Sequence, residues 1–114
     1  MTEPSVIYHI TLADLWKKSL ESGIYKGETL DTEGFIHFSK ENQVVATANR
    51  YYRGVKGLFL LRVNPAKLSA ELKYEKSTNG ELYPHLYGPL NLEAVDKVVE
   101  FNPDPSGEFS RLPF

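Results

Sequence analysis

Residues 57–63 read GLFLLRV, a near-continuous apolar run that ends at Asn64-Pro65. A run with so little alternation predicts a strand at the centre of a sheet, buried on both faces. The chain has 114 residues, which is a single-domain length, and no shift in composition divides it. We therefore expect one domain over residues 1–114, with a core over 6–101 and a C-terminal surface tail over 102–114.

Shorter apolar patterns predict the other elements. Helix 12–22 is expected to start at a Thr11 cap, and helix 40–53 at a Ser39 cap. Residues 24–33 are mostly polar, contain Gly27, and are expected to form a loop. Strands outnumber helices late in the chain, which favours an α+β fold of five to six short strands and two helices over a regular βαβ alternation. The expected strands are 6–10, 34–38, 57–63, 70–75 and 95–101.

The chain has three histidines, and each has apolar or aromatic neighbours. His9 lies in IYHIT, His37 in GFIHFS and His85 in YPHLYG; the prolines and glycine around His85 indicate a rigid, irregular segment over 81–90. Any one of these rings could be a packed core residue bonded to backbone carbonyls. Burying three such rings costs free energy unless their nitrogens are paired, so together they favour a shared site. Side-chain alternation places Phe35, His37 and Ser39 on one face.

Three chemical schemes fit these residues. A metal site of three histidines lacks a diagnostic ligand spacing, and we expect no metal. A hydrolase triad would combine Ser39, a histidine, and Glu75 or Glu81, but no nucleophile-elbow motif is present. The third scheme is a pocket for a phosphate-bearing or nucleotide ligand, where imidazoles, the Ser39 hydroxyl and a helix N-terminus would meet the anion.

Charge and composition exclude several classes of protein. The chain has 13 basic and 15 acidic residues, a net charge of −2 with both signs scattered, so a nucleic-acid partner is not expected. It has no cysteine, no signal-peptide pattern and no apolar segment long enough to span a bilayer. A cytoplasmic location without a membrane partner is the expectation.

Several motifs occur in a fixed order and together resemble the domain-of-unknown-function 952 family over about residues 6–101. That family is grouped with the ADP-ribosyltransferase-like superfamily, so the resemblance implies a compact domain with a split, strongly bent mixed β-sheet that grips NAD in a cleft. It implies that His9 contacts a ribose and that Glu75 or Glu81 is a late catalytic carboxylate. It also implies that His37 falls near the position of an aromatic residue that stacks on nicotinamide. Distant RNA 2′-phosphotransferases of the superfamily use histidine and arginine instead. The motifs are IYHIT, Trp16 to Tyr25, EGFIHFS, QVVATANRYY, LFLLRVNPAKL and ELYPHLYGPL.

The resulting hypothesis is an enzyme with a histidine-lined cleft. Its ligand would be NAD, as a substrate, or a related phosphorylated nucleotide. His37 and His85 are the expected catalytic residues, while His9, Ser39 and Tyr87 are expected to bind the ligand, with Tyr87 stacking on it. Two alternatives are a non-catalytic binding module for a small anionic metabolite, and a domain whose histidines are only packed.

Overall fold

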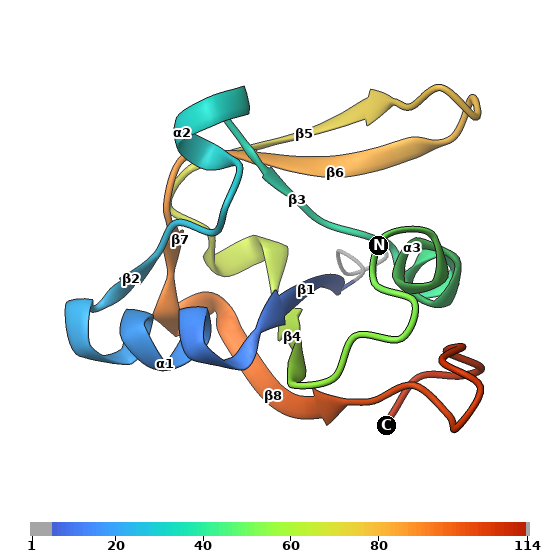
Figure 1. Ribbon diagram of the computed structural model, residues 1–114. Helices are drawn as coiled ribbons and strands as arrows, with labels where there is room; N and C mark the ends of the chain where they lie inside the picture. Colours follow the sequence, from blue (N-terminus) through green and yellow to red (C-terminus); the bar gives the residue numbers. More distant parts are fainter. Residues whose placement is uncertain (1–5, 114) are drawn as a thin grey trace.

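The computed structural model describes residues 6–113, which fold into eight strands and three α-helices with short 3-10 turns between them (Figure 1). The helices are α1 (Ala13–Ser22), α2 (Leu30–Glu33) and α3 (Val44–Tyr51). The strands are β1 (Ile7–Leu12), β2 (Ile24–Tyr25), β3 (Ile36–His37), β4 (Leu58–Val63), β5 (Glu71–Lys76), β6 (Leu82–Tyr87), β7 (Leu90–Asn91) and β8 (Val95–Phe101).

The apolar run 57–63 forms β4, the middle strand of a central sheet with the order β1-β4-β8. Four of its six side chains are no more than 1% exposed. Leu58 and Leu60 point to one face of the sheet, and Leu61 and Val63 contribute to the core on the other face. The prediction of a central strand buried on both sides is therefore confirmed.

The two faces of the central sheet carry separate apolar cores. The α1-side core lies beneath α1 and two smaller sheets, and the α3-side core lies beneath α3 and the C-terminal segment. The buried residues of the α1-side core are Ile7, Trp16, Tyr25, Ile36, Phe38, Leu61, Val63, Leu86, Leu90 and Ala94. Those of the α3-side core are Tyr8, Ile10, Val44, Ala48, Leu58, Leu60, Phe101 and Phe109.

The smaller sheets are β2-β7 and β3-β6-β5, the second of which we call the outer sheet. One isolated bridge joins the outer sheet to the central sheet: Tyr8 and Ser39 exchange two backbone hydrogen bonds of 2.8 Å. The architecture is thus α+β and split, as expected. Every strand pair between residues 6 and 113 is antiparallel, however, so the expectation of a mixed sheet is wrong. The reason is that α1 and α3 each connect strands of different sheets, so neither makes a parallel crossover.

Several element boundaries differ from the sequence prediction. Thr11 is not a helix cap, because β1 extends to Leu12 and the helix begins at Ala13. Ser39 is not a cap either, because its backbone pairs with Tyr8; a 3-10 turn over Glu41–Gln43 precedes the shorter α3. Strand β2 and helix α2 occupy the expected loop 24–33, and these two extra short elements are too small to show a periodicity.

The segment ELYPHLYGPL contains β6, the middle strand of the outer sheet, and not the irregular segment that its prolines indicate. Proline lacks the N–H that a central strand normally donates. Pro84 lies at the point where β3 ends: the Phe38 N–H donates to the Pro84 carbonyl at 2.9 Å, and the reciprocal bond cannot form. The proline is therefore accommodated where the pairing with β3 stops.

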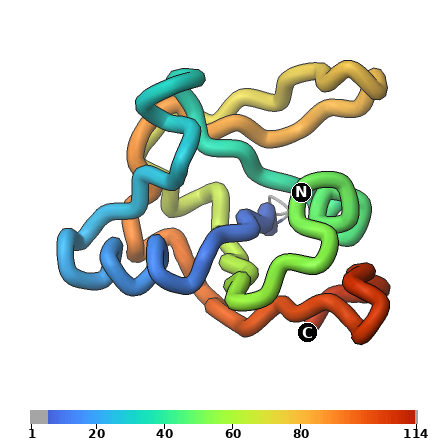
Figure 2. The backbone as a smooth tube through the Cα atoms, in the orientation of Figure 1, coloured from blue at the N-terminus to red at the C-terminus, as the bar shows by residue number. Residues whose placement is uncertain are grey.

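The C-terminal segment contributes more to the core than a surface tail would. Phe109 is 3% exposed and packs on Phe101 with ring centroids 4.7 Å apart. The Asn49 side chain accepts from the Phe109 N–H at 2.7 Å and donates to its carbonyl at 2.8 Å. In Figure 2 this segment (red) passes close to the chain that follows α3 (green), where Gly54 donates to the Gly107 carbonyl at 2.8 Å. The sequence pattern missed Phe109 because one aromatic residue between prolines shows no periodicity.

The end of β6 depends on a close backbone approach at Gly88, which leads to a first prediction. A Cβ atom at Gly88 would lie 2.7 Å from the Cβ of Ala70, at a φ of +158°. We expect Gly88→Ala to lower the free energy of unfolding by about 2 kcal/mol, measured by urea denaturation, since the contact forces the backbone to shift. Ala70→Gly in the same chain should recover part of this loss.

Gly80→Ala is the control for this measurement. Gly80 has a φ of +85° but open space around its Cβ position, so that variant reports the conformational cost without a collision. The close contact would be contradicted if Gly88→Ala and Gly80→Ala lowered the free energy of unfolding equally, and if adding Ala70→Gly to Gly88→Ala recovered none of the loss.

Candidate functional site

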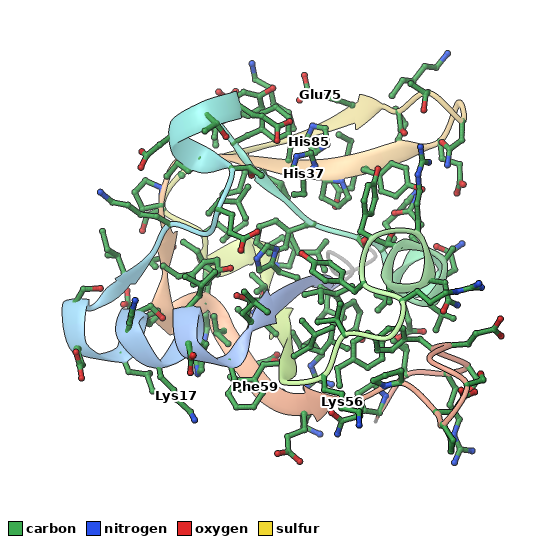
Figure 3. The ribbon with its side chains drawn as sticks, viewed as in Figure 1. Lys17, His37, Lys56, Phe59, Glu75 and His85 are labelled. Carbon is green, nitrogen blue, oxygen red and sulfur yellow. The ribbon has the colours of Figure 1, made fainter. Side chains whose placement is uncertain are left out.

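The three histidines come from three different strands; the rings of His37 and His85 are adjacent, and His9 contacts the backbone of His37. His37 of β3 is directly opposite His85 of β6 in the antiparallel register, and their ring centroids are 5.2 Å apart. Figure 3 shows these two rings close together on the outer sheet, with Glu75 near them. His9 of β1 contacts the same region through its Nδ1, which lies 2.6 Å from the His37 carbonyl oxygen.

His9 has a hydrogen-bond partner for each ring nitrogen. Its Nδ1 donates to the His37 carbonyl, so the neutral ring accepts at Nε2, where the Tyr25 hydroxyl lies 2.6 Å away. The Tyr25 hydroxyl is also placed to donate to Thr11 Oγ1 at 2.7 Å, so its single proton has two acceptors within reach, Thr11 Oγ1 and His9 Nε2. Burial lowers the pKa of His9 to about 4, so the ring is neutral near pH 7. Both ring nitrogens of His9 thus have partners within the protein, and its ligand role stays a prediction.

His85 is held by a carboxylate and an aromatic ring. Glu75 Oε1 accepts from His85 Nδ1 at 2.8 Å and from the Tyr87 hydroxyl at 2.5 Å. Phe35 stacks on the imidazole with centroids 4.2 Å apart and the planes 19° from parallel. The Tyr87 and His85 hydrogen bonds lower the pKa of Glu75, and the bond to Glu75 raises the pKa of Tyr87. Glu75 therefore stays ionised and fixes the ring with Nδ1 protonated, which leaves Nε2 to accept a proton.

His37 forms a second imidazole–carboxylate pair. Its Nε2 lies 3.2 Å from Glu33 Oε1, and its side chain is 49% exposed. The Phe35 ring, 4.8 Å from that of His37, fills the space beside both imidazoles. Glu33 ends the one-turn helix α2, an element that the sequence pattern did not indicate, and for that reason this partner was not predicted.

A small cleft opens between β1, α1, β2 and the loop that follows β2. His9, Thr11, Tyr25, Glu28 and His37 are among the residues that line it, and its volume is about 60 Å³. That volume holds a few water molecules and is far below the several hundred Å³ typical of a site that encloses a cofactor. Tyr25 and Thr11 were not among the predicted site residues; for Tyr25 the one signal is its place in the family motif.

The remaining predicted residues lie in different surroundings. Tyr87 belongs to the cluster through Glu75, but Ser39 is 5% exposed and donates its hydroxyl to Thr47 of α3 at 3.2 Å. Of the two candidate late carboxylates, Glu75 contacts His85, whereas Glu81 contacts Gln43 and Asn79 near the hairpin turn. The ligand roles of Ser39 and Tyr87 stay predictions.

No group of three or more His, Cys, Asp or Glu side chains within residues 6–113 is arranged to hold a metal ion. In that same part of the chain, no helix has the length and apolar character needed to cross a membrane.

The hydrogen bonds of His9 predict a pH-dependent stability. The unfolded chain binds a proton at His9 near pH 6.5 and the folded chain near pH 4, so the free energy of unfolding falls as the pH drops between these values. The loss should reach about 3 kcal/mol and should be absent above pH 7. Urea denaturation from pH 7.5 to 4.5 measures it, and His9→Gln should remove most of the slope.

His37→Gln is the matched control, because that ring is half exposed. An NMR titration of the imidazole protons gives the direct check. A His9 resonance that titrates near 6.5 in the folded protein would contradict the neutral, doubly bonded ring.

Comparison with known proteins gives one family and a set of similar structures. No curated protein matches the sequence. The crystal structure of protein CC0527 from Caulobacter crescentus is 34% identical with a TM-score of 0.85, over 93% of this chain and 94% of that chain. A crystal structure of a double mutant of CC0527 is 33% identical with the same TM-score and coverage. The solution NMR structure is 34% identical with a TM-score of 0.80, over 92% and 91% of the two chains.

The family match covers most of the elements described above. The model of the family described as "Protein of unknown function (DUF952)" matches residues 10–98, from the middle of β1 to within β8. The match includes His37 and His85 with their carboxylate partners, while His9 lies immediately before it. The chain belongs to the DUF952 family.

Proposed function

We propose that this protein is a transferase-like enzyme that acts on NAD or a related phosphorylated nucleotide, with His37 and His85 as its catalytic residues. One observation carries the proposal: two imidazoles 5.2 Å apart, each hydrogen-bonded to its own carboxylate. A carboxylate that orients a histidine is the usual way to set up a general base, because it fixes the tautomer and stabilises the protonated ring. Two such pairs side by side can contact two positions of one substrate.

His85 is the better placed base of the two. Glu75 fixes its Nδ1–H, and the ring is only 12% exposed, so its orientation is constrained on both sides by Phe35 and Glu75. If the enzyme transfers the ADP-ribosyl group of NAD, the Nε2 atom of His85 would take the proton of the hydroxyl group that attacks the ribose carbon. Nicotinamide leaves as a neutral ring and needs no proton.

His37 would contact the ribose hydroxyls or the phosphate, because its ring is half exposed and next to His85. The Lys73 ammonium lies 4.9 Å from the centroid of the Tyr87 ring and places a positive charge beside the same cluster. This cation supports an anionic substrate. The cleft beside His9 is too small for a nucleotide, which favours binding across the open face of the outer sheet, with Tyr87 available for stacking. Ser39 would then support the site from the core side.

The second candidate function is a non-catalytic binding module for a small anionic metabolite. The small cleft favours it, since about 60 Å³ suits a ligand of a few atoms and His37 lines that cleft as well. A binder needs no base at His85. The two functions therefore differ in what the loss of that residue does.

The test measures nicotinamide release from NAD together with the shift in melting temperature on adding NAD, NADP or ADP-ribose. We expect release by the wild type, and a loss of about 100-fold or more in His85→Gln and Glu75→Gln, since general base catalysis contributes that much. His37→Ala should lose activity without losing the fold. Glu81→Gln is the matched control, because Glu81 is on the same hairpin but bonds to Gln43 and Asn79.

The outcomes separate the candidates. A rise in melting temperature without turnover would favour the binding module. Neither turnover nor a shift with any of the three nucleotides would overturn the proposal and support the reading of packed histidines.

A further inference from the structure

A second concave surface lies on the far side of Tyr25, between α1 and β2, and we call it the α1–β2 groove. It has a volume of about 450 Å³, within the range of small-molecule sites. We propose that this groove binds an amphipathic organic anion, namely a carboxylate with an apolar body of medium chain length. The inference does not depend on the proposed function, because the groove contains none of the three histidines.

One face of α1 and the strand β2 build the groove. Leu15, Lys18, Ser19 and Ser22 follow the i, i+3, i+4, i+7 spacing of a single helix face, and Ile24 and Tyr25 form the opposite wall. Ile24 is 40% exposed, a large apolar side chain left open to solvent on a two-residue strand. The apolar side chains of this surface match an apolar ligand body.

The charges that line the groove have one sign. Its charged residues are Lys18 and Lys26, one from each side, and both are exposed. Among residues 6–113 neither ammonium group has an ion-pair partner within 4 Å. The small cleft on the other side of Tyr25 differs, because its lining includes the carboxylate of Glu28. An anion is therefore complementary to the groove, whose lining includes two lysines and no carboxylate.

The two serine hydroxyls of the groove already donate hydrogen bonds within the protein. The Ser19 hydroxyl donates to the Trp16 carbonyl at 2.6 Å, and the Ser22 hydroxyl to the Ile24 carbonyl at 3.0 Å. These hydroxyls have no free proton to offer a sugar or a bare phosphate. The groove thus presents two ammonium groups and an apolar surface, which fits an anion with a hydrocarbon body better than a hydrophilic one.

A ligand in the groove would also change the surroundings of His9, through Tyr25. Leu15 and Tyr25 line both the groove and the small cleft, so the Tyr25 ring separates the two. The Tyr25 hydroxyl contacts His9 Nε2, and the Trp16 ring centroid is 6.3 Å from that of Tyr25. Trp16 is the single tryptophan of the chain, so its fluorescence gives a local signal for binding.

The experiment titrates the isotope-labelled full chain with sodium octanoate and follows the amide resonances by NMR. We expect saturable shifts confined to about residues 15–27, with much weaker binding of 1-octanol and of inorganic phosphate. The double variant Lys18→Gln, Lys26→Gln should weaken octanoate binding about fivefold, since exposed ion contacts contribute modestly. Ile24→Ala should weaken it too, by reducing the apolar surface.

Lys17→Gln is the matched control, because Lys17 is an exposed neighbour on the same helix that does not line the groove; Figure 3 shows its side chain pointing away from the helix. It should bind octanoate like the wild type. Three results would overturn the proposal: equal weakening in the Lys17 variant, phosphate binding as tight as octanoate binding, or shifts spread over the whole chain. Tight binding to phosphatidylglycerol vesicles without saturable octanoate binding would instead identify a membrane surface, and would overturn it as well.

Discussion

Strand β4 has to be covered on both of its faces, and the arrangement of the other elements follows from that requirement. A small chain cannot provide two full layers of long elements, so it covers the two faces with short ones. On one side α1 and the two smaller sheets bury Leu61 and Val63, and on the other α3 and the C-terminal segment bury Leu58 and Leu60. The division into three sheets is the result, because the strands of the two smaller sheets pack over the central sheet as a separate layer.

The three histidines show how distant partners determine the chemistry of similar local sequences. All three have apolar neighbours along the chain, yet each is bonded to a different kind of group. Tyr25 and a backbone carbonyl give His9 two uncharged partners, while Glu75 and Glu33 give His85 and His37 carboxylate partners. The free energy cost of an unpaired buried nitrogen explains why His9 and His85 have partners, whereas the half-exposed His37 does not need one for that reason. No polar side-chain atom that is fully buried among the described residues lacks one.

Long apolar patterns in the sequence predicted the elements they belong to. Strand β8 begins and ends at the expected residues, and β4 differs by one. The two-residue strands and the single turn of α2 could not be predicted, because a periodicity needs more residues than these elements have. For the site, alternation along β3 put Phe35, His37 and Ser39 on one face; the Phe35 and His37 rings are in contact, but the Ser39 hydroxyl bonds to Thr47 of α3. The carboxylate partners of His85 and His37 follow from the register between β5 and β6 and from α2, which local sequence does not specify. That is why Glu33 was missed and why Glu75 and Glu81 stayed equivalent candidates.

Pro84 has one more consequence, which concerns the ways in which β3 could pair incorrectly. A slip of two residues keeps every side chain on its own face, so the apolar pattern alone does not discriminate against it. If β3 slid along β6 by two residues so that Ile36 met Pro84, a proline would lie opposite a residue that needs its N–H, and His37 would face Tyr83. The native register leaves the same donor missing opposite Phe38, beyond the last residue of β3, whereas the slipped register would place the gap opposite Ile36, inside the strand. In the register that places His37 opposite His85, the residue that looks least suited to a central strand thus interrupts the pairing only after β3 has ended.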